Sequence, residues 1–368
     1  MAHVASLSQL QTPPWASVDG ELKPYTDVNL HISAEALTRA LSVFEGVKGY
    51  WDPEESTFRL RSPAAHHERL KRSAQLFHIP FDVSYEEFVR RHTQLAAELL
   101  VPEKDLWLRP TLHVTEGHWG EGTAATMVIT AFTQTKSETA PMKLGVSTWR
   151  RGTDVDLPTR VKGSANYVVA RLARIEVRKR GYDDAVLLNR EGRVAEATGA
   201  CVVMVTDEGV VVPPSSEGAL DSLTVRILEQ LCLREGVGFT RRPMDRTELL
   251  AAREVGIAGT ISELTLVDEV DGFAFPTDGV LRDLRSSYMR VMRGEDHLPG
   301  VDMVPVLTAQ DIAPDELATS GRTASLREAV RPATRPRRRP RRAPRASGRG
   351  RTRGGSRAGS SRCTPRRR

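Results

Sequence analysis

The arginine content of the chain changes abruptly after Gly321, and this change limits which part of the chain can fold. Residues 331–368 contain sixteen arginines but no lysine, no acidic residue and no aromatic residue. The whole chain has a formal net charge of +6, so residues 1–330 carry −10. A segment with so little apolar surface cannot form a packed core. We therefore predict an acidic globular part, followed by a basic tail that is rich in arginine, proline and glycine and disordered from about residue 322.

The basic tail allows two interpretations. It is either an arm that binds the phosphates of nucleic acid by charge or an extension without a binding role. Its Arg-Pro-Arg-Gly sequences have no aromatic residues between the charges, and such sequences carry little chemistry for recognising bases. We favour the second interpretation and do not expect nucleic acid as a partner.

Composition also narrows the class of protein. The chain has 368 residues, of which 39% are apolar, so it is long enough for two domains with cores of their own. It contains no apolar run long enough to span a bilayer and no signal-peptide pattern near Met1. The three cysteines, Cys201, Cys232 and Cys363, lack the spacing of a disulfide framework or a zinc site. We expect a cytoplasmic protein without membrane contact and without a bound metal.

Breaks in the pattern suggest where the domains begin and end. The polar segment Thr133–Pro141 interrupts the apolar periodicity and is the expected linker between domains. The predicted organisation is a loose lead-in over residues 1–20, a small N-terminal α/β domain over 21–135, a large domain over 136–300 and a tail over 301–368.

Capping and turn signals predict the main elements. Hairpins are expected across Asp52–Ser56 and around Asp271-Gly272. Helix starts are expected from capping residues and from apolar periodicity. The starts lie at Ser62-Pro63, Ser84, Asn166, Leu223, Asp245 and Val280. Helices and strands therefore mix throughout the globular part.

Lys162 is the first candidate for chemistry. It lies in the run Val161-Lys162-Gly163-Ser164-Ala165, just before an amphipathic helix. Small neighbours let a flat ligand approach the backbone closely. Desolvation disfavours the charged form of an amine, and a neutral amine can attack an aldehyde such as that of pyridoxal phosphate. A solvated lysine before a helix would give the same local pattern, so the rest of the sequence must decide between the two.

Six segments together resemble one family. In them the chain resembles the fold-type IV pyridoxal-phosphate aminotransferases, and branched-chain aminotransferases in particular, from about Val18 to about Gly294. The resemblance implies a mixed α/β fold with two domains, like that of D-amino-acid aminotransferase. It also implies a homodimer that transfers an amino group from a donor such as glutamate to a 2-oxo acid. The segments are Ser42–Gly46, His66–Leu70, Leu108–Pro110, Val161–Tyr167, Glu196 and Ala258–Thr260.

The same resemblance implies roles for cofactor-binding residues. Lys162 matches the family's Schiff-base lysine, which also moves a proton. Glu196 matches the carboxylate that pairs with the pyridine nitrogen, and Tyr167 matches the tyrosine that bonds the phenolic oxygen. The positions that match the family's phosphate contacts are Arg69, Leu223, Thr224 and Thr260.

Substrate-binding residues follow from the resemblance as well. Thr260 and Ile261 match the turn whose N–H groups hold the substrate's α-carboxylate, and Arg109 matches the residue that holds glutamate's side-chain carboxylate. The other pocket positions are Phe44, Arg39, Lys48 and Trp107.

Five positions depart from the branched-chain pattern. Arg39 and Trp107 stand where that family has tyrosine, and Lys48 stands where it has arginine. Cys201 replaces an asparagine and Ser222 replaces a glycine. Unpaired cations beside a buried aliphatic side chain are unfavourable, so Arg39 and Lys48 predict a preference for polar or anionic substrates over branched aliphatic ones.

Two alternatives to an aminotransferase remain open on the sequence. A pyridoxal-phosphate lyase of the aminodeoxychorismate type would use the same lysine. A relative without catalytic activity, acting through its basic tail, would retain the fold alone.

Overall fold

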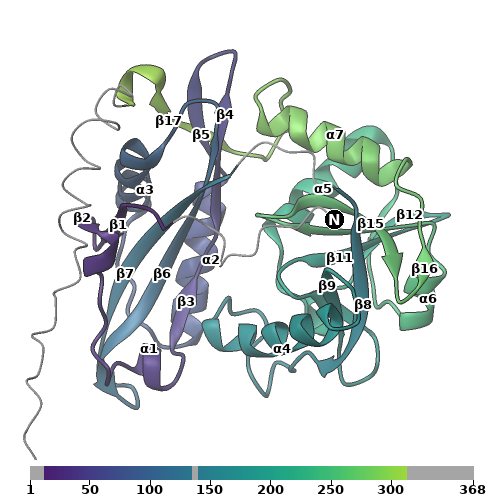
Figure 1. The fold of residues 1–368 in the computed structure, drawn as a ribbon, viewed down its shortest axis with the longest axis horizontal. Coiled ribbons are helices and arrows are strands. Elements are labelled where there is room, and N and C mark those ends of the chain that lie inside the picture. The colour runs from purple at the N-terminus through teal and green to yellow at the C-terminus, as the bar shows by residue number, and fades with distance from the viewer. Residues whose placement is uncertain (1–11, 135–139, 313–368) are drawn as a thin grey trace, which may run out of the picture. The chain divides into compact units, whose positions relative to one another are not determined.

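Two large β-sheets organise the residues that the computed structural model describes, which are 12–134 and 140–312 (Figure 1). These residues belong to one compact unit that ends at Pro314. The predicted disordered tail lies outside the described residues, as does most of the predicted linker.

The first sheet has eight strands among the described residues, and all of its pairings are antiparallel. Their order is β17-β5-β4-β6-β7-β1-β2, and β3 pairs with β6. The strands are β1 (Trp15–Val18), β2 (Glu21–Pro24), β3 (Ser42–Phe44), β4 (Val47–Asp52), β5 (Thr57–Arg61), β6 (Asp105–His118), β7 (Glu121–Gln134) and β17 (Met303–Thr308). The helices between them are α1 (Glu35–Thr38), α2 (Pro63–Leu76) and α3 (Tyr85–Leu99).

The second sheet has nine strands among the described residues and mixes parallel with antiparallel pairs. Its order is β10-β9-β8-β15-β14-β11-β12-β13, and β16 pairs with β15. The strands are β8 (Met142–Arg150), β9 (Asp184–Leu188), β10 (Val194–Ala197), β11 (Cys201–Thr206), β12 (Gly209–Val212), β13 (Phe239–Arg241), β14 (Glu254–Gly259), β15 (Glu263–Val270) and β16 (Phe273–Ala274). The helices of this part are α4 (Tyr167–Arg178), α5 (Leu223–Glu235), α6 (Arg246–Leu250) and α7 (Val280–Met292).

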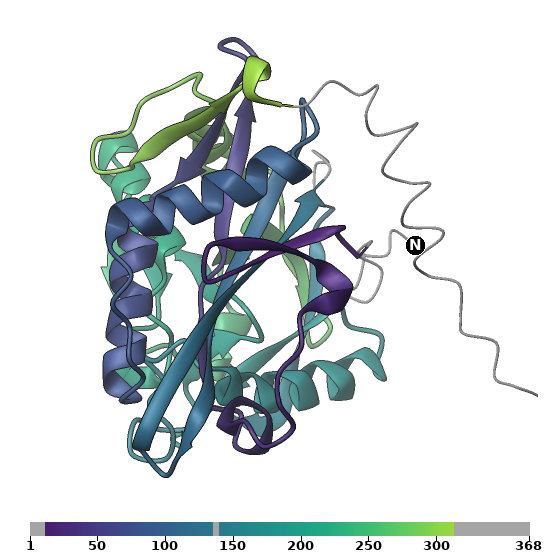
Figure 2. The ribbon, with the colours of Figure 1, turned by 90° about the vertical axis from the view of Figure 1, so that its left-hand side faces the viewer.

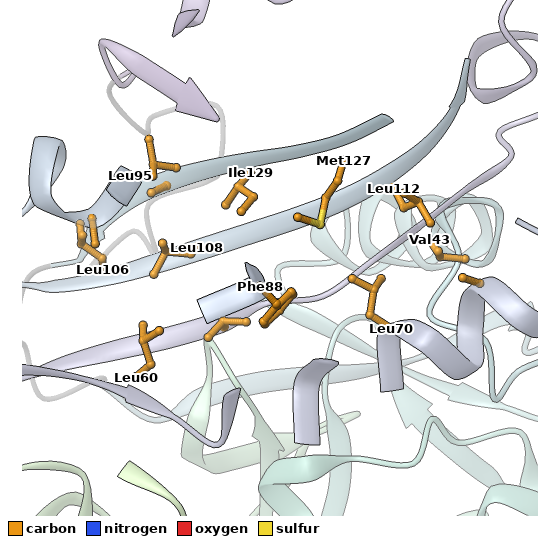
Figure 3. Close-up of a cluster of buried hydrophobic side chains, with 14 of the residues drawn as sticks. Val43, Leu60, Leu70, Phe88, Leu95, Leu106, Leu108, Leu112, Met127 and Ile129 are labelled. Carbon is orange, nitrogen blue, oxygen red and sulfur yellow. The ribbon is translucent and has the colours of Figure 1, made fainter. Parts of the chain in front are cut away.

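Alternation along its strands gives the first sheet one apolar and one polar face. Leu106 and Leu108 of β6 pack in a core with side chains of α2 and α3. Trp107 and Arg109 alternate with these leucines along the strand and therefore point to the other face. Figure 3 shows this core, and Figure 2 shows α3 lying across the face of the sheet. The polar face therefore carries two of the candidate pocket residues, Trp107 and Arg109.

The second sheet is apolar on both faces. Along β11, Val203 and Val205 pack with α5 and α7, while Val202 and Met204 pack in a separate cluster on the opposite face. Cover on both faces explains why this strand has an unbroken apolar sequence. Tyr50 of β4 also packs into the cluster with α5 and α7, which joins the polar face of the first sheet to the second sheet.

Two strands lie in segments that were predicted to be a loose lead-in and a tail. β1 falls within the expected lead-in and pairs with β2 and β7, and β17 falls within the expected tail and pairs with β5. β1 pairs with β2 across the Asp19-Gly20 turn, which is a local hairpin signal, whereas its hydrogen bonds with β7 and those of β17 with β5 depend on distant residues. Sheet membership changes between β7 and β8, close to the predicted linker, and the division into two domains remains a prediction.

Candidate active site

Backbone hydrogen bonds fix Lys162 on both sides. Its carbonyl oxygen accepts from the N–H of Phe44 at 3.0 Å, and its own N–H donates to Ser73 Oγ at 3.2 Å. These bonds tie the segment before α4 to β3 and α2. A Cβ atom on Gly163 would lie 2.9 Å from Phe77 Cε2, so glycine is needed for this close approach.

The amine of Lys162 points toward two aromatic rings. Its Nζ donates to Tyr167 Oη at 2.7 Å and lies 5.0 Å from the centre of the Phe44 ring. The two rings are 5.0 Å apart. No carboxylate of the described residues forms an ion pair with this amine, so no ion pair competes with a covalent bond at the nitrogen.

Glu196 of β10 forms an ion pair with an arginine that the sequence analysis did not single out. Its Oε1 lies 3.0 Å from Arg151 Nη2, and its Oε2 accepts from the N–H of Leu220 at 2.9 Å. Arg151 is held in turn by the carbonyl oxygens of Gly218 and Asn166. Gly218 has φ of +93°, and an added Cβ would lie 3.1 Å from Arg151 Cγ. The carboxylate is therefore oriented from two sides.

Arg69 forms a two-pronged ion pair with Glu45. Its Nε and Nη2 donate to the two oxygens of Glu45 at 2.6 and 2.7 Å, and its Nη1 donates to the Asp221 carbonyl at 2.7 Å. Burial alone would raise the pKa of Glu45. The charge and hydrogen bonds of Arg69, together with a hydrogen bond from His66, nevertheless hold the pKa of Glu45 well below its usual range. Arg69 thus joins α2 to the loop before α5.

His66, one turn before Arg69, completes this buried group. Burial lowers the pKa of His66 to about 4 despite the opposing effect of Glu45, so the ring is neutral near pH 7. Since ionised Glu45 can only accept, the 2.8 Å contact is a hydrogen bond from His66 Nδ1–H. The remaining nitrogen, Nε2, therefore carries a lone pair.

The N-terminus of α5 has donors to spare. The Ser222 side chain accepts the N–H of Val225 at 3.3 Å, but the first N–H groups of a helix, here those of Leu223 and Thr224, have no partner within the helix. Thr224 Oγ1 is buried and has no hydrogen-bond partner among the described residues. Arg69 binds the carbonyl of Asp221, which precedes the N-cap residue Ser222. Arg69, the Thr224 hydroxyl and the free N–H groups of the helix together form a candidate anion site.

Thr260 and Ile261 lie in the turn between β14 and β15. Thr260 Oγ1 accepts a hydrogen bond from Arg61 Nη2 at 2.8 Å, and Arg61 lies at the end of β5 in the other sheet. The Ile261 side chain is exposed. This turn therefore meets the polar face of the first sheet.

Three pocket residues come together on that polar face. The Arg109 guanidinium lies 4.2 Å from the centre of the Phe44 ring, and burial lowers the pKa of Arg109. Its Nε and the Nε1 of Trp107 are buried without hydrogen-bond partners in the described part of the chain. An added Cβ on Gly46 would lie 2.7 Å from Trp107 Nε1, so the indole lies directly over this glycine.

Lys48 and Arg39 differ from the expectation that they are unpaired cations. Lys48 Nζ lies 2.6 Å from Glu263 Oε1, with both side chains largely buried. Arg39 lies 3.3 Å from Glu35 Oε1 and stacks on Trp119 at the tip of the β6–β7 hairpin. The expected preference for polar substrates loses its basis, because both cations have carboxylate partners. Arg109 is the pocket cation without a carboxylate partner among the described residues.

Two further departures have local explanations. Ser222 has φ of −81°, so its backbone does not need the glycine of the family, and its side chain caps α5. Burial, reinforced by the charge of Glu196, raises the pKa of the Cys201 thiol to about 12. Cys201 is thus a buried, protonated side chain in β11.

Comparison with known proteins decides the family. Residues 42–270, more than half of the chain, match the family model for amino-transferase class IV. The chain belongs to the class IV aminotransferases. As a member of this family it is a transaminase, and the predicted fold-type IV architecture is confirmed.

Several relatives of this class IV aminotransferase carry related names. A probable branched-chain-amino-acid aminotransferase of Aquifex aeolicus is 27% identical over 290 residues, which cover 76% of this chain and 93% of the relative. The enzyme of Pseudomonas aeruginosa is 30% identical, over 69% of this chain and 84% of its own. The branched-chain enzyme of Thermoproteus uzoniensis with norvaline has a TM-score of 0.75 and 26% identity, covering 80% of this chain and all of that one.

A holo structure is also among the similar folds. The PLP form of the branched-chain aminotransferase from Thermobaculum terrenum has a TM-score of 0.71 and 27% identity, over 77% of this chain and 95% of that one. The class IV aminotransferase described here is therefore branched-chain aminotransferase-like. Within its described residues, no helix is long and apolar enough to cross a membrane, and no cluster of metal-ligating side chains occurs.

Sequence reasoning missed Arg61 and Arg151 as members of the site. Glu45 and His66 lay inside matching segments, although their mutual contact was not foreseen. For Arg61 there was a signal: Phe58 and Leu60 are apolar, so alternation along the strand places Arg61 on the opposite face. No local pattern marks Arg151.

Proposed function

We propose that this protein is a pyridoxal-phosphate-dependent aminotransferase, with glutamate as amino donor and a 2-oxo acid as acceptor. The observation that carries the proposal is the amine of Lys162, held 2.7 Å from Tyr167 Oη and free of any carboxylate partner among the described residues. The names of its relatives favour branched-chain 2-oxo acids as acceptors. The proposal extends to a homodimer, as the family resemblance implies, and to the cytoplasm, as the spacing of the cysteines suggests.

The residues present fit this cofactor. Thr224 Oγ1 is a buried hydroxyl without a partner in the described part, at the start of a 13-residue helix and next to the Arg69 contact. These groups would hold the phosphate, with Thr260 as a further hydroxyl. Glu196 would hold the ring nitrogen, and Tyr167 the phenolic oxygen. When bound, the cofactor supplies an electron sink for charge that develops at the substrate's α-carbon.

Each site residue then has a distinct task. Lys162 is the attachment point, and its Nζ carries the proton between the α-carbon and the cofactor. Tyr167 positions this nitrogen through the 2.7 Å hydrogen bond. Arg151 and the N–H of Leu220 hold the Glu196 carboxylate in one orientation, in which it would pair with a protonated ring nitrogen.

Arg109 supports glutamate as the donor. A buried guanidinium without a carboxylate among the described residues is unfavourable until an anion pairs with it. The side-chain carboxylate of glutamate is such an anion. Phe44 beside it supplies an apolar surface, which gains about 0.8 kcal/mol for each methylene that an aliphatic substrate buries. The N–H groups of Thr260 and Ile261 would hold the α-carboxylate.

A product assay tests the proposal. The purified full chain is incubated with each amino acid and 2-oxoglutarate, and glutamate is measured. Glutamate formation with at least one amino acid is the expected result. A lyase of the aminodeoxychorismate type would release a product without making glutamate, and a relative without activity would bind no cofactor that absorbs visible light.

A further inference from the structure

Arg61 is a fully buried cation with unusually few partners. Its relative exposure is 0%. Within the described part of the chain, only Nη2 has hydrogen-bonding partners: it donates to Thr260 Oγ1 at 2.8 Å and lies 3.5 Å from His66 Nε2. Among the same residues, Nε and Nη1 have no hydrogen-bond partner and no carboxylate pairs with the side chain. A buried charge without a counter-ion destabilises a fold, so its presence calls for a compensating role.

Glu45, the carboxylate of the surrounding hydrogen-bond network, pairs with Arg69 instead of Arg61. Glu45 accepts both prongs of Arg69 and also the Nδ1–H of His66. His66 is neutral, so it offers Arg61 a lone pair but no negative charge. The chain of contacts runs from Thr260 through Arg61, His66 and Glu45 to Arg69 and thus ends at the loop before α5.

Arg61 fixes the role of the Thr260 hydroxyl. An arginine can only donate hydrogen bonds, so Thr260 Oγ1 must accept at 2.8 Å. The single hydroxyl proton of Thr260 is then left for another acceptor, and none is present among the described residues. Arg61 has no exposed surface, so it acts on a ligand beside this turn through the Thr260 hydroxyl that it holds.

We propose that Arg61 is a positioning residue that makes Thr260 a dedicated donor to the cofactor's phosphate. The inference rests on the proposed function, since it assumes that this phosphate occupies the candidate anion site at α5. The doubly charged phosphate supplies the negative charge that Arg61 lacks. The network leads to Arg69 and the start of α5, and this direction favours the phosphate over the substrate's α-carboxylate as the anion served.

The test measures discrimination between cofactors that differ only in the phosphate. Dissociation constants of pyridoxal phosphate and pyridoxal are measured for the cofactor-free full chain, together with its melting temperature. The variants are Arg61→Met, Thr260→Val and the double variant. Arg59→Met is the matched control, because Arg59 lies on the same strand and pairs with Asp52 and Glu55.

Arg61→Met is expected to raise the dissociation constant of pyridoxal phosphate roughly tenfold or more, as for loss of a charge-assisted hydrogen bond. The dissociation constant of pyridoxal should change less than about twofold. The cofactor-free variant should melt at or above the wild-type temperature, because an uncompensated buried charge is gone. The double variant should discriminate no less than Thr260→Val alone. Arg59→Met should keep wild-type discrimination.

Other outcomes overturn the inference in distinguishable ways. Arg61 is structural if Arg61→Met weakens the binding of both ligands equally, or if the cofactor-free variant has a lower melting temperature than the wild type. It is also structural if the loss of discrimination in Arg61→Met adds in full to that in Thr260→Val. If Thr224→Val reduces discrimination while Arg61→Met does not, the phosphate site stands and the role of Arg61 falls. A wild type that does not prefer pyridoxal phosphate over pyridoxal would refute the proposed function and this inference together.

Discussion

Lys48 and Glu263 lie 215 residues apart in sequence, yet Lys48 Nζ is 2.6 Å from Glu263 Oε1. The pair joins β4 of the first sheet to the start of β15 in the second sheet. Each charge is largely buried and is cancelled by the other. Lys48 therefore supports the contact between the sheets at the pocket, and its charge is not free for a substrate.

This pairing predicts that a double variant is more stable than one of its single variants. Glu263→Gln leaves a buried lysine without a counter-ion and should lower the free energy of unfolding by about 3 kcal/mol. Lys48→Met combined with Glu263→Gln should recover most of that loss, because no charge is left unpaired. Urea unfolding of the wild type and of the single and double variants measures the effect. A double variant as unstable as Glu263→Gln alone would contradict the argument.

Replacement of Lys162 should abolish transamination. Lys162→Ala removes both the attachment point and the proton carrier, so turnover should fall by at least about 10²-fold. Borohydride reduction of the wild type, followed by peptide mapping, should find the pyridoxyl group on Lys162. Lys143→Ala is the control, because Lys143 is half exposed and pairs with Glu269. An adduct on Lys143, Lys179 or Lys48 would contradict the assignment of Lys162 as the attachment point.

Arg109 should set the preference for glutamate. Arg109→Met removes the partner of the donor's side-chain carboxylate, so kcat/KM for glutamate should fall roughly tenfold to a hundredfold, as for a hydrogen bond to a charged group. The value for leucine should fall much less. Arg39→Met serves as comparison, because Arg39 is paired with Glu35. Equal losses for both amino acids would mean that Arg109 supports the pocket without selecting the donor.

Acid should destabilise the fold through a buried histidine. His92 is fully buried, and its Nδ1 donates to the Phe88 carbonyl oxygen at 2.7 Å. Burial lowers the pKa of His92 from 6.5 to about 4. Between these values the unfolded chain binds a proton that the folded chain does not, so the free energy of unfolding falls as the pH drops from 6.5 to 4. The loss is about 3 kcal/mol.

The variant His92→Leu isolates this contribution. In urea unfolding at several pH values, its stability should depend on pH less steeply, by about 1.4 kcal/mol per pH unit within that window. Exposed His297→Gln is the control and should behave as the wild type. An unchanged slope in His92→Leu would assign the acid sensitivity to other groups.

The basic tail should be dispensable for turnover. Its composition gives it no core, and it follows the last helix that resembles the family. A chain truncated after Leu326 should retain its visible cofactor band and its kcat. A tenfold fall in kcat/KM, about 1.4 kcal/mol of transition-state stabilisation, would reveal a role for the tail.

Local signals in the sequence predicted much of the fold. Pro63 marks the start of α2, the hairpin of β4 and β5 crosses residues 53–56, and Gly236 at φ of +69° ends α5. Each of these depends on a few adjacent residues. β1 has a nearby partner in β2, but its pairing with β7 and the pairing of β17 with β5 join residues more than 100 and 200 positions apart, and no adjacent residue predicts these two pairings.

The site divides in the same way. Lys162 and Tyr167 are five residues apart, and resemblance to the family placed both of them before their contact was known. The Arg61–Thr260 hydrogen bond joins residues 199 positions apart. Strand alternation indicates which face Arg61 occupies, but its full burial and its lack of a carboxylate partner among the described residues are properties of the fold.

The pairing of β17 with β5 limits how far the chain can be truncated before it aggregates. β17 lies beyond the segment that matches the family model, and it covers the edge of β5 from Thr57 to Arg61. Without it, the outer row of N–H and C=O groups on β5 would be open to strands of other molecules, which is a route to aggregation. Truncation at the end of α7 would therefore expose the unpaired edge of β5, whereas truncation after β17 would leave it paired.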